Sequence, residues 1–261
     1  MRRYASLYCN DRLIILDADG TTIDAFSAIE KTFAAHDMRI GDLERFQKRR
    51  HLFKYLGGLK EFPSNLKRQL GKQKRARLIQ TLTEVYREEA QLYEQIAAWI
   101  NRLIEHPNLR VGLITRNITH SPVETLRIML QRHNVDADDL DFLVHIPLSS
   151  DKTAAFRQVR TDLAINPARA YACGDEKKDY LAAMATGMHP FMVSYGFEDF
   201  ERLTQKIGVP GELISRTPAE FRSRVCHALD IASNDALCAG IPHPRIRSLA
   251  SGTNLTPAYV Q

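Results

Sequence analysis

The sequence predicts an α/β protein with a doubly wound parallel-sheet core and an inserted block that is entirely helical. Short apolar runs alternate with segments of helical periodicity through most of the chain, which is typical of strands and helices wound into a parallel sheet. The alternation stops between about residues 25 and 100, where only helical spacing occurs. We therefore expect a core over residues 1–24 and 100–231, an inserted domain over 25–99 and an irregular tail over 232–261.

The first expected strand ends in two acidic residues. Its apolar run, residues 13–16, has the composition of a strand that is buried on both faces. Asp17 and Asp19 follow at once, and Gly20 lets the chain turn. Ligands of open parallel sheets bind at the carboxyl ends of the strands, and two neighbouring carboxylates repel each other unless a cation or a proton lies between them. The pair indicates a divalent-metal site with a nucleophile or an acid/base pair, and a simple acidic turn is the alternative.

The inserted block begins with a helix expected over residues 25–36, where apolar residues recur at helical spacing. Residues 45–77 then carry many lysines and arginines against a single acid, Glu61. Apolar residues return at helical spacing over residues 78–103, as one long helix or as two joined helices.

Four further strands complete the expected sheet, over residues 111–114, 141–146, 170–173 and 191–194. The helix after the first of them should begin with Ser121 as N-cap, Pro122 at the first helical position and Glu124 completing a capping box. Further helices are expected after residue 151, before Gly187, over residues 198–206 and from Thr217 to about 231.

Composition and charge are those of an ordinary globular protein. The chain has 261 residues, of which 44% are hydrophobic and 26% charged, and a formal net charge of +5. No apolar run approaches the length of a membrane span and no targeting segment is recognisable, so we expect a cytoplasmic protein without membrane contact. The four cysteines form no close pair in the sequence, which favours reduced thiols.

Polar residues gather at one edge of the expected sheet. Thr115 ends a strand, Lys152 starts a helix, and Asp175 and Asp179 follow a later strand. Because the carboxyl ends of parallel strands share one edge, these residues should lie near the acidic pair that follows the first strand.

With these motifs in this order, the sequence resembles the haloacid dehalogenase superfamily, in its phosphatase-like branch. The matching motifs are Asp17-Ala18-Asp19-Gly20-Thr21, the strand-terminal Thr115, Lys152, and Gly174-Asp175 with Asp179 following. The resemblance covers roughly residues 8–24 and 105–230. It implies a Rossmann-like core and makes the helical insertion the cap domain of that family.

The resemblance implies a role for each acid. Asp17 would attack phosphorus and form a phosphoaspartyl intermediate, and Asp19 would protonate the leaving oxygen and then help to deprotonate water. Mg²⁺ would be held by the carboxylates of Asp17 and Asp175 and by the backbone carbonyl of Asp19, since hard oxygen ligands suit this ion. Asp179 would orient a metal-bound water or Lys152, and an ordinary helix-start acid is the alternative for it.

The same resemblance implies contacts with the phosphoryl group. Thr115 and nearby backbone N–H groups would hold its oxygens, and Gly20 and Arg116 are further candidates for substrate binding. Lys152 would offset the negative charge.

One departure from the family pattern affects the lysine. Thr153 follows Lys152, where proline is common in the family. Lys177 and Lys178 therefore stay open as alternatives, although they lie on the metal motif itself.

The basic segment 45–77 would lie in the cap, where it could choose an anionic substrate. Arg49 and Lys54 are the candidate substrate contacts, and a solvated basic face is the alternative. Nucleic-acid binding is disfavoured, because aromatic residues occur only sparsely among the basic ones.

The presence of Asp19 favours phosphate esters, since the dehalogenase branch lacks this second aspartate and the phosphonate-cleaving branch usually has alanine there. We therefore predict a magnesium-dependent phosphatase that acts on a small phosphorylated metabolite. A phosphomutase or phosphotransferase of the same family shares the intermediate and differs in whether water or a hydroxyl takes the phosphoryl group. A non-catalytic binding module that uses the basic cap is the alternative of another class.

Overall fold

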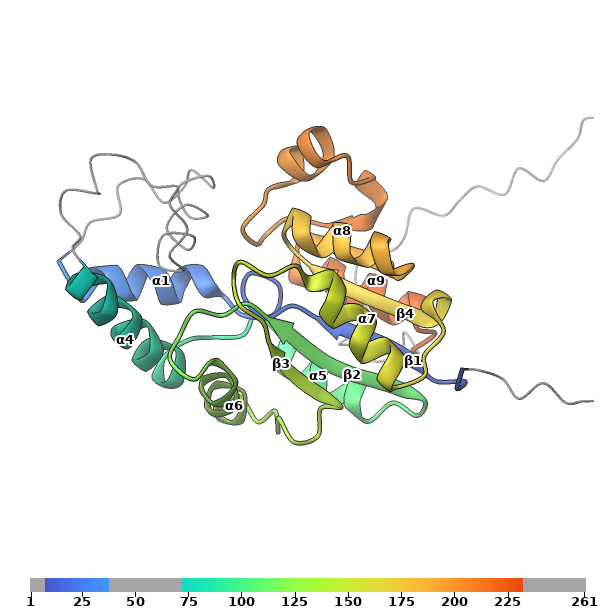
Figure 1. Cartoon of the computed structure of the whole chain (residues 1–261), viewed down its shortest axis with the longest axis horizontal. Helices are drawn as coiled ribbons and strands as arrows, with labels where there is room; N and C mark the ends of the chain where they lie inside the picture. The colour runs from blue at the N-terminus through green and yellow to red at the C-terminus, as the bar shows by residue number, and fades with distance from the viewer. Residues whose placement is uncertain (1–7, 38–71, 232–261) are drawn as a thin grey trace, which may run out of the picture.

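The computed structural model describes residues 8–37 and 72–231 (Figure 1). Over these residues the core is one sheet of six parallel strands, in the order β3-β2-β1-β4-β5-β6. The strands are β1 (Arg12–Leu16), β2 (Leu109–Thr115), β3 (Phe142–His145), β4 (Ala170–Gly174), β5 (His189–Val193) and β6 (Ile214–Ser215). The chain winds outward from the central β1 in both directions, which confirms the predicted doubly wound sheet. The sequence did not predict β6, because two residues are too few to form a strand pattern.

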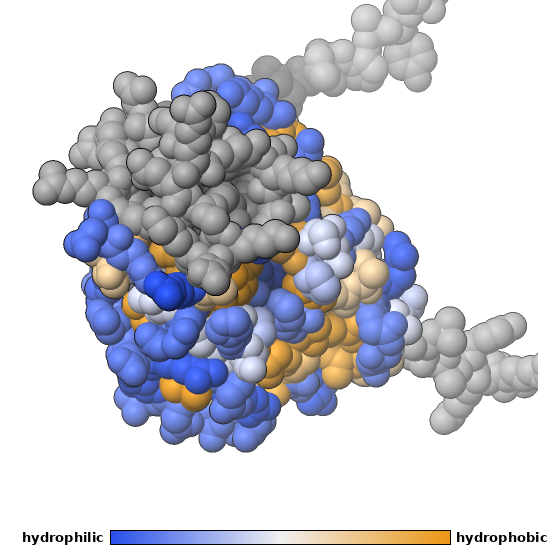
Figure 2. Space-filling model, turned by 60° about the vertical axis from the view of Figure 1, so that its left-hand side comes forward, coloured by the Kyte–Doolittle hydropathy of each residue, from blue (hydrophilic) through white to orange (hydrophobic). Residues whose placement is uncertain are grey.

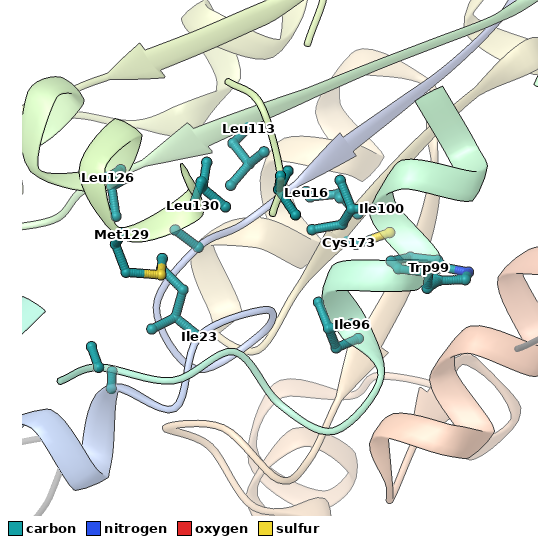
Figure 3. Packing of buried hydrophobic residues seen from close by; sticks show 14 of the residues in the cluster. Leu16, Ile23, Ile96, Trp99, Ile100, Leu113, Leu126, Met129, Leu130 and Cys173 are labelled. Atoms are coloured by element: carbon teal, nitrogen blue, oxygen red, sulfur yellow. The ribbon is translucent and has the colours of Figure 1, made fainter. Parts of the chain in front are cut away.

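Helices cover both faces of the sheet. They are α5 (Ile96–Ile104), α6 (Pro122–Arg132) and α9 (Pro218–Ala228) on one face, and α7 (Lys152–Asp162) and α8 (Lys177–Thr186) on the other. Successive side chains of a strand point to opposite faces. In β1, Ile14 and Leu16 therefore join the first layer, whereas Leu13 and Ile15 join the second. Figure 3 shows part of the first layer, where Leu16 lies among side chains from β2, α5 and α6.

The pairing of the central strands brings their ends level. Leu16, the last residue of β1, is paired with Leu113 of β2 and with Cys173 of β4. The residues that follow these three positions therefore lie at one edge of the sheet, which is where open parallel sheets bind their ligands.

Two described helices lie in the expected insertion. These are α1 (Ala25–Ala34) and α4 (Lys72–Glu88), which pack against each other beside the core. Asp24 caps α1, since its carboxylate accepts a hydrogen bond from Ser27 N at 3.2 Å. Figure 2 turns this side forward and shows hydrophilic residues over much of its described surface, with hydrophobic residues between them.

The apolar stretch over residues 78–103 forms two helices, α4 and α5. α5 crosses the expected domain boundary at residue 99, and its Trp99 packs against Phe221 of α9 with ring centroids 5.3 Å apart. This contact attaches α5 to the helical layer of the core.

Some local details differ from the expectations. Ser121 does precede α6, but its φ of 46° is left-handed and its side chain caps no N–H group, so the predicted capping box is not formed. The helix expected over residues 198–206 starts later, because Asp199 Oδ1 accepts a hydrogen bond from Arg202 N, and it ends in a π-helical segment, η2 (Arg202–Ile207). Short 3₁₀ helices are η1 (Pro167–Arg169) and η3 (Gly211–Leu213).

The cysteines are not all reduced. Cys9 and Cys173 carry free thiols, as expected. Cys226 is disulfide-bonded, so the expectation of reduced thiols is wrong for this residue. Within residues 8–37 and 72–231, no helix is both long and apolar enough to cross a membrane.

Candidate functional site

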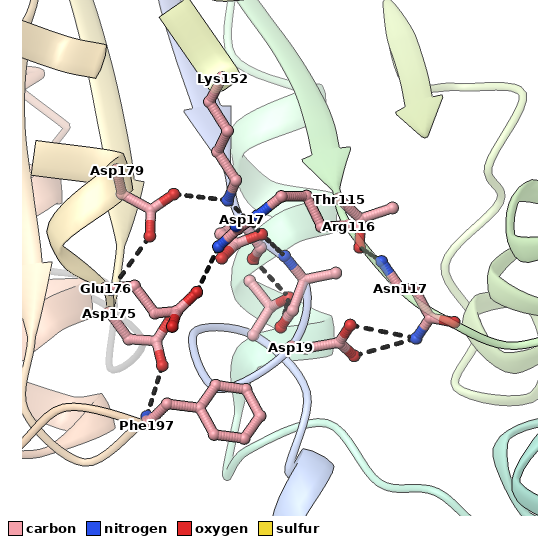
Figure 4. A network of polar contacts seen from close by, with 12 residues as sticks. Asp17, Asp19, Thr115, Arg116, Asn117, Lys152, Asp175, Glu176, Asp179 and Phe197 are labelled. Carbon is pink, nitrogen blue, oxygen red and sulfur yellow. Dashed lines mark hydrogen bonds and ion pairs between the residues drawn. The ribbon is translucent and has the colours of Figure 1, made fainter. Parts of the chain in front are cut away.

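The carboxyl edge of the sheet collects the polar residues that the sequence singles out (Figure 4). They come from the loops after β1 and β4, the end of β2 and the first turns of α7 and α8. All are buried: Asp17, Asp19, Thr115, Lys152, Asp175 and Asp179. Residues that are far apart in the sequence, from Asp17 to Asp179, thus meet in one site.

Lys152 lies between two of the acids. Its Nζ is 2.8 Å from Asp17 Oδ1 and donates a 2.5 Å hydrogen bond to Asp179 Oδ1. Burial lowers the pKa of Lys152, but the two carboxylates outweigh burial and leave this pKa above its ordinary value. The amine is therefore a permanent positive charge. The alternative lysines are exposed, and Lys178 Nζ donates to Leu148 O at 3.4 Å.

Three buried carboxylates cluster around this one lysine. Ligand oxygens of Asp17, Asp175 and Asp179 all lie within 4.8 Å of one another. Burial raises the pKa of Asp17 to about 7, against the opposing effect of Lys152, and it raises the pKa of Asp175 well above its ordinary value. When all three acids are ionised, the cluster carries more negative charge than its lysine offsets, and a bound cation would stabilise this ionised form.

Asp175 offers the clearest place for such a cation. Its Oδ2 accepts a 2.5 Å hydrogen bond from Phe197 N, whereas its buried Oδ1 has no hydrogen-bond partner among the described residues. A buried carboxylate oxygen without a donor is costly unless a metal ion or water binds it. By contrast, Asp179 uses both oxygens, because its Oδ2 accepts from Glu176 N at 3.0 Å. Asp175 thus suits a ligand role, and Asp179 holds Lys152.

Two glycines leave room for the Asp175 carboxylate. Gly20 has a φ of +84°, and a side-chain carbon at Gly20 or Gly196 would overlap Asp175 Oδ2. The N–H of Gly20 donates to Ile23 O at 3.0 Å and so closes the turn after β1. In this structure Gly20 therefore shapes the acidic cluster.

Asp19 points away from this cluster and is held by uncharged donors. Tyr86 of α4 donates its hydroxyl to Asp19 Oδ1 at 2.6 Å. Asn117 Nδ2 donates to Oδ1 at 3.2 Å and to Oδ2 at 3.1 Å. Burial raises the pKa of Asp19 to about 6, and the hydrogen bonds from Tyr86 and Asn117 oppose this rise. The two acids of the first motif therefore have different surroundings.

Thr115 and Arg116 line the edge between these groups. Thr115 Oγ1 accepts a 3.0 Å hydrogen bond from Asn117 N, which tightens the turn after β2. The buried guanidinium of Arg116 forms an ion pair with Glu176. Burial lowers the pKa of Arg116, but Glu176 and the nearby aspartates keep it above its ordinary value. Arg116 thus brings a second fixed positive charge to the site.

The remaining sequence candidates, Arg49 and Lys54, lie outside the described residues. Conversely, sequence reasoning missed Tyr86 and Asn117. Tyr86 belongs to an apolar helical pattern and looks like any packing residue, whereas Asn117 could have been noticed as a polar residue just beyond the strand that ends at Thr115.

Comparison with known proteins supports a particular family. Residues 14–193 match the family model described as haloacid dehalogenase-like hydrolase. A search of curated protein sequences finds no match.

Solved structures share the fold at low identity. A haloacid dehalogenase-like hydrolase from Streptococcus pneumoniae is 20% identical, with a TM-score of 0.54 over 82% of this chain and 98% of the other. A protein described as a predicted phosphoglycolate phosphatase, from Haemophilus somnus, is 13% identical, with a TM-score of 0.58 over 84% and 99%. A protein assigned by prediction as a β-phosphoglucomutase, from Thermotoga maritima, is 16% identical, with a TM-score of 0.57 over 83% and 99%.

Proposed function

Because the chain belongs to the haloacid dehalogenase-like hydrolase family, we propose that it is a magnesium-dependent phosphatase that hydrolyses a small phosphorylated metabolite through a phosphoaspartyl intermediate. The observation that supports this proposal is the pair of acids with different surroundings. Asp17 lies against the positive charge of Lys152, whereas Asp19 is held by the neutral donors Tyr86 and Asn117. Such a division suits a nucleophile and an acid/base group in one reaction.

Asp17 is the nucleophile in this proposal. Lys152 and the N–H of Ala18, which donates to Asp17 Oδ1 at 2.9 Å, fix its carboxylate. A carboxylate oxygen of Asp17 forms a bond to phosphorus as the bond from phosphorus to the leaving oxygen breaks. Lys152 and Arg116 offset the charge that remains on the phosphoryl oxygens.

Asp19 moves the protons. It gives a proton to the leaving oxygen in the first step, and in the second step it takes a proton from the water that attacks phosphorus and releases Asp17. Thr115 and the backbone N–H groups around it bind the phosphoryl oxygens.

Mg²⁺ fits the oxygen-rich cluster. The carboxylates of Asp17 and Asp175 and the backbone carbonyl of Asp19 would hold the ion, and the buried Oδ1 of Asp175 supports this assignment. When bound, the ion neutralises charge on the phosphoryl group. Asp179 orients Lys152 in this scheme.

We also propose the domain division expected from the sequence, with a core over 1–24 and 100–231 and a cap over 25–99. In this division the cap selects the substrate, and Arg49 and Lys54 remain proposed contacts of an anionic substrate.

The test is turnover of an aryl phosphate with Mg²⁺. We expect release of inorganic phosphate by the wild type, and its loss both in Asp17→Asn and after addition of a chelator. The matched control is Asp162→Asn, which changes an exposed carboxylate on α7 in the same way. Unchanged turnover in Asp17→Asn would contradict the mechanism, and no turnover on a broad phosphate panel would favour a binding module.

Phosphoryl transfer to a second hydroxyl is the alternative, supported by the structural similarity to the protein described as a β-phosphoglucomutase. The two reactions share the Asp17 intermediate. They are separated by comparing inorganic phosphate released with alcohol released: equal amounts indicate hydrolysis, and a phosphate deficit that grows with added sugar indicates transfer.

A further inference from the structure

Tyr86 and Asn117 together hold both oxygens of Asp19, although they come from parts of the chain far apart in sequence (Figure 4 shows Asn117 and Asp19). We infer that Tyr86 is a positioning residue that fixes the carboxylate of Asp19 in the orientation from which it protonates the leaving oxygen. This inference rests on the proposed phosphatase function and adds a residue from the insertion to its proton transfer.

Packing alone does not require a hydroxyl at position 86. Tyr86 is fully buried among apolar residues of the large core cluster, including Leu82 and Val85 of the same helix. A phenylalanine ring would fill almost the same volume. The one group that the tyrosine adds is its hydroxyl, and this donates a 2.6 Å hydrogen bond to Asp19 Oδ1. The hydroxyl therefore serves Asp19.

The position of Tyr86 is fixed by contacts between α4 and the core on both sides of it. Thr83 Oγ1 accepts from His120 N at 2.9 Å, and Arg87 Nε donates to Thr125 Oγ1 at 3.2 Å. At the end of the helix, the guanidinium of Arg132 donates to the backbone carbonyls of residues 88 and 90. This stretch of α4 is thus attached to α6 and the loop before it, so the Tyr86 hydroxyl is held in place relative to the site.

The orientation of the Asn117 amide is fixed as well. Thr119 N donates to Asn117 Oδ1 at 2.9 Å, and a backbone N–H can only donate. The amide oxygen must therefore face Thr119, which leaves Nδ2 facing Asp19. His145 Nε2 lies 3.0 Å from Asn117 O and adds a contact to the backbone of the same residue.

These contacts distinguish the two oxygens of Asp19. Oδ1 accepts from both Tyr86 and Asn117, whereas among the described residues Oδ2 accepts from Asn117 alone. The oxygen with fewer donors is the one with room for a proton, so Oδ2 is the oxygen that transfers it. Without the Tyr86 hydroxyl, the carboxylate can turn about its side-chain bonds and this assignment is lost.

A misplaced acid should affect the departure of poor leaving groups most. The experiment compares Tyr86→Phe with wild type, each with Mg²⁺, on 4-nitrophenyl phosphate and on phenyl phosphate. Nitrophenolate leaves without a proton, whereas the more basic phenolate needs one. Because Asp19 also acts in the hydrolysis step that both esters share, the quantity compared is kcat/KM, which reports only the steps up to departure of the leaving group. Since a positioned general acid contributes on the order of a hundredfold or more, we expect kcat/KM on phenyl phosphate to fall about tenfold, with little change on 4-nitrophenyl phosphate.

Two controls separate positioning from a structural effect. Tyr171→Phe removes the hydroxyl of a tyrosine that donates to Ala228 O at 3.4 Å, away from the site, and should leave both rates unchanged. In an Asp19→Asn background, Tyr86→Phe should have no further effect on the ratio of the two rates, because the group through which it acts is gone. Thermal unfolding of each variant checks that it is folded.

The outcomes distinguish the inference from the function on which it rests. No turnover of either ester by the wild type would overturn the proposed function and this inference with it. An equal fall in kcat/KM on both esters, no fall on either ester, or an effect on the ratio that persists in the Asp19→Asn background would overturn the inference and leave the phosphatase in place.

Discussion

The two sides of the site are built from different chemistry. On the Asp17 side, charged groups face one another: Lys152 pairs with Asp17 and Asp179, and Asp175 has a buried oxygen without a donor among the described residues. On the Asp19 side, the donors are a phenol and an amide, and the phenol, Tyr86, comes from α4. In the proposed mechanism this difference separates charge stabilisation from proton transfer, although the two acids are only two residues apart.

The largest loss of stability is expected when the positive charge on the Asp17 side is removed. Lys152→Met removes the positive charge and keeps an unbranched side chain that is one atom shorter, and it leaves Asp17 and Asp179 without this partner in the interior. Removing one partner of a buried ion pair costs about 3–5 kcal/mol, so the free energy of unfolding in chelator should fall by about that amount.

Urea titration measures this loss. The control is Lys206→Met, because Lys206 is exposed and its substitution should change stability by about 0.5 kcal/mol or less. A loss of stability in Lys152→Met that is no larger than this would mean that Lys152 does not stabilise the fold through its pairing with the buried acids.

The second prediction concerns how far Mg²⁺ stabilises the folded protein, which can be measured without any turnover. If the ion binds the acidic cluster around Asp17 and Asp175 in the folded protein, Mg²⁺ at 100 times its dissociation constant should stabilise the wild type by about 2.7 kcal/mol. Asp175→Asn should lose this gain, and in chelator it should be at least as stable as the wild type, since it removes a buried negative charge. Thermal unfolding with and without Mg²⁺ checks both. An undiminished gain in Asp175→Asn would place the ion elsewhere.

A third, smaller effect is expected at the turn between the two sides. Gly20→Ala puts a methyl group onto the Asp175 carboxylate at a residue with a φ of +84°. Overpacking of this kind typically costs about 1–3 kcal/mol. The comparison is Gly208→Ala, which has a similar φ of +79° but nothing within 4 Å of the added carbon. Equal losses in the two variants would mean that the backbone conformation, rather than the carboxylate, sets the requirement for glycine at position 20.

The same division explains what the sequence could predict. The doubly wound core could be predicted from the alternation of strands and helices, because strands buried on both faces produce short apolar runs. The charged side was also predictable, since Asp17, Lys152 and Asp175 each follow or begin a regular element of the core. Tyr86 was not, because a tyrosine in an apolar helical pattern has the same sequence signature whether its hydroxyl is used or not. The failed cap at Ser121 has a similar cause, since a left-handed backbone leaves no mark on residue type.

The smallest effect on stability should come from a change on the Asp19 side, where the donors are uncharged. Tyr86→Phe removes one hydrogen bond while the amide of Asn117 still serves Asp19, so the free energy of unfolding should fall by only about 0.5–1.5 kcal/mol. This loss should be the same with and without Mg²⁺, because a neutral hydroxyl does not alter the charge of the acidic cluster. Urea titration of both proteins in both conditions measures it. If Tyr86→Phe instead weakened the gain from Mg²⁺, the hydroxyl would be acting on the metal site through the backbone of Asp19, and the two sides would be one coupled unit.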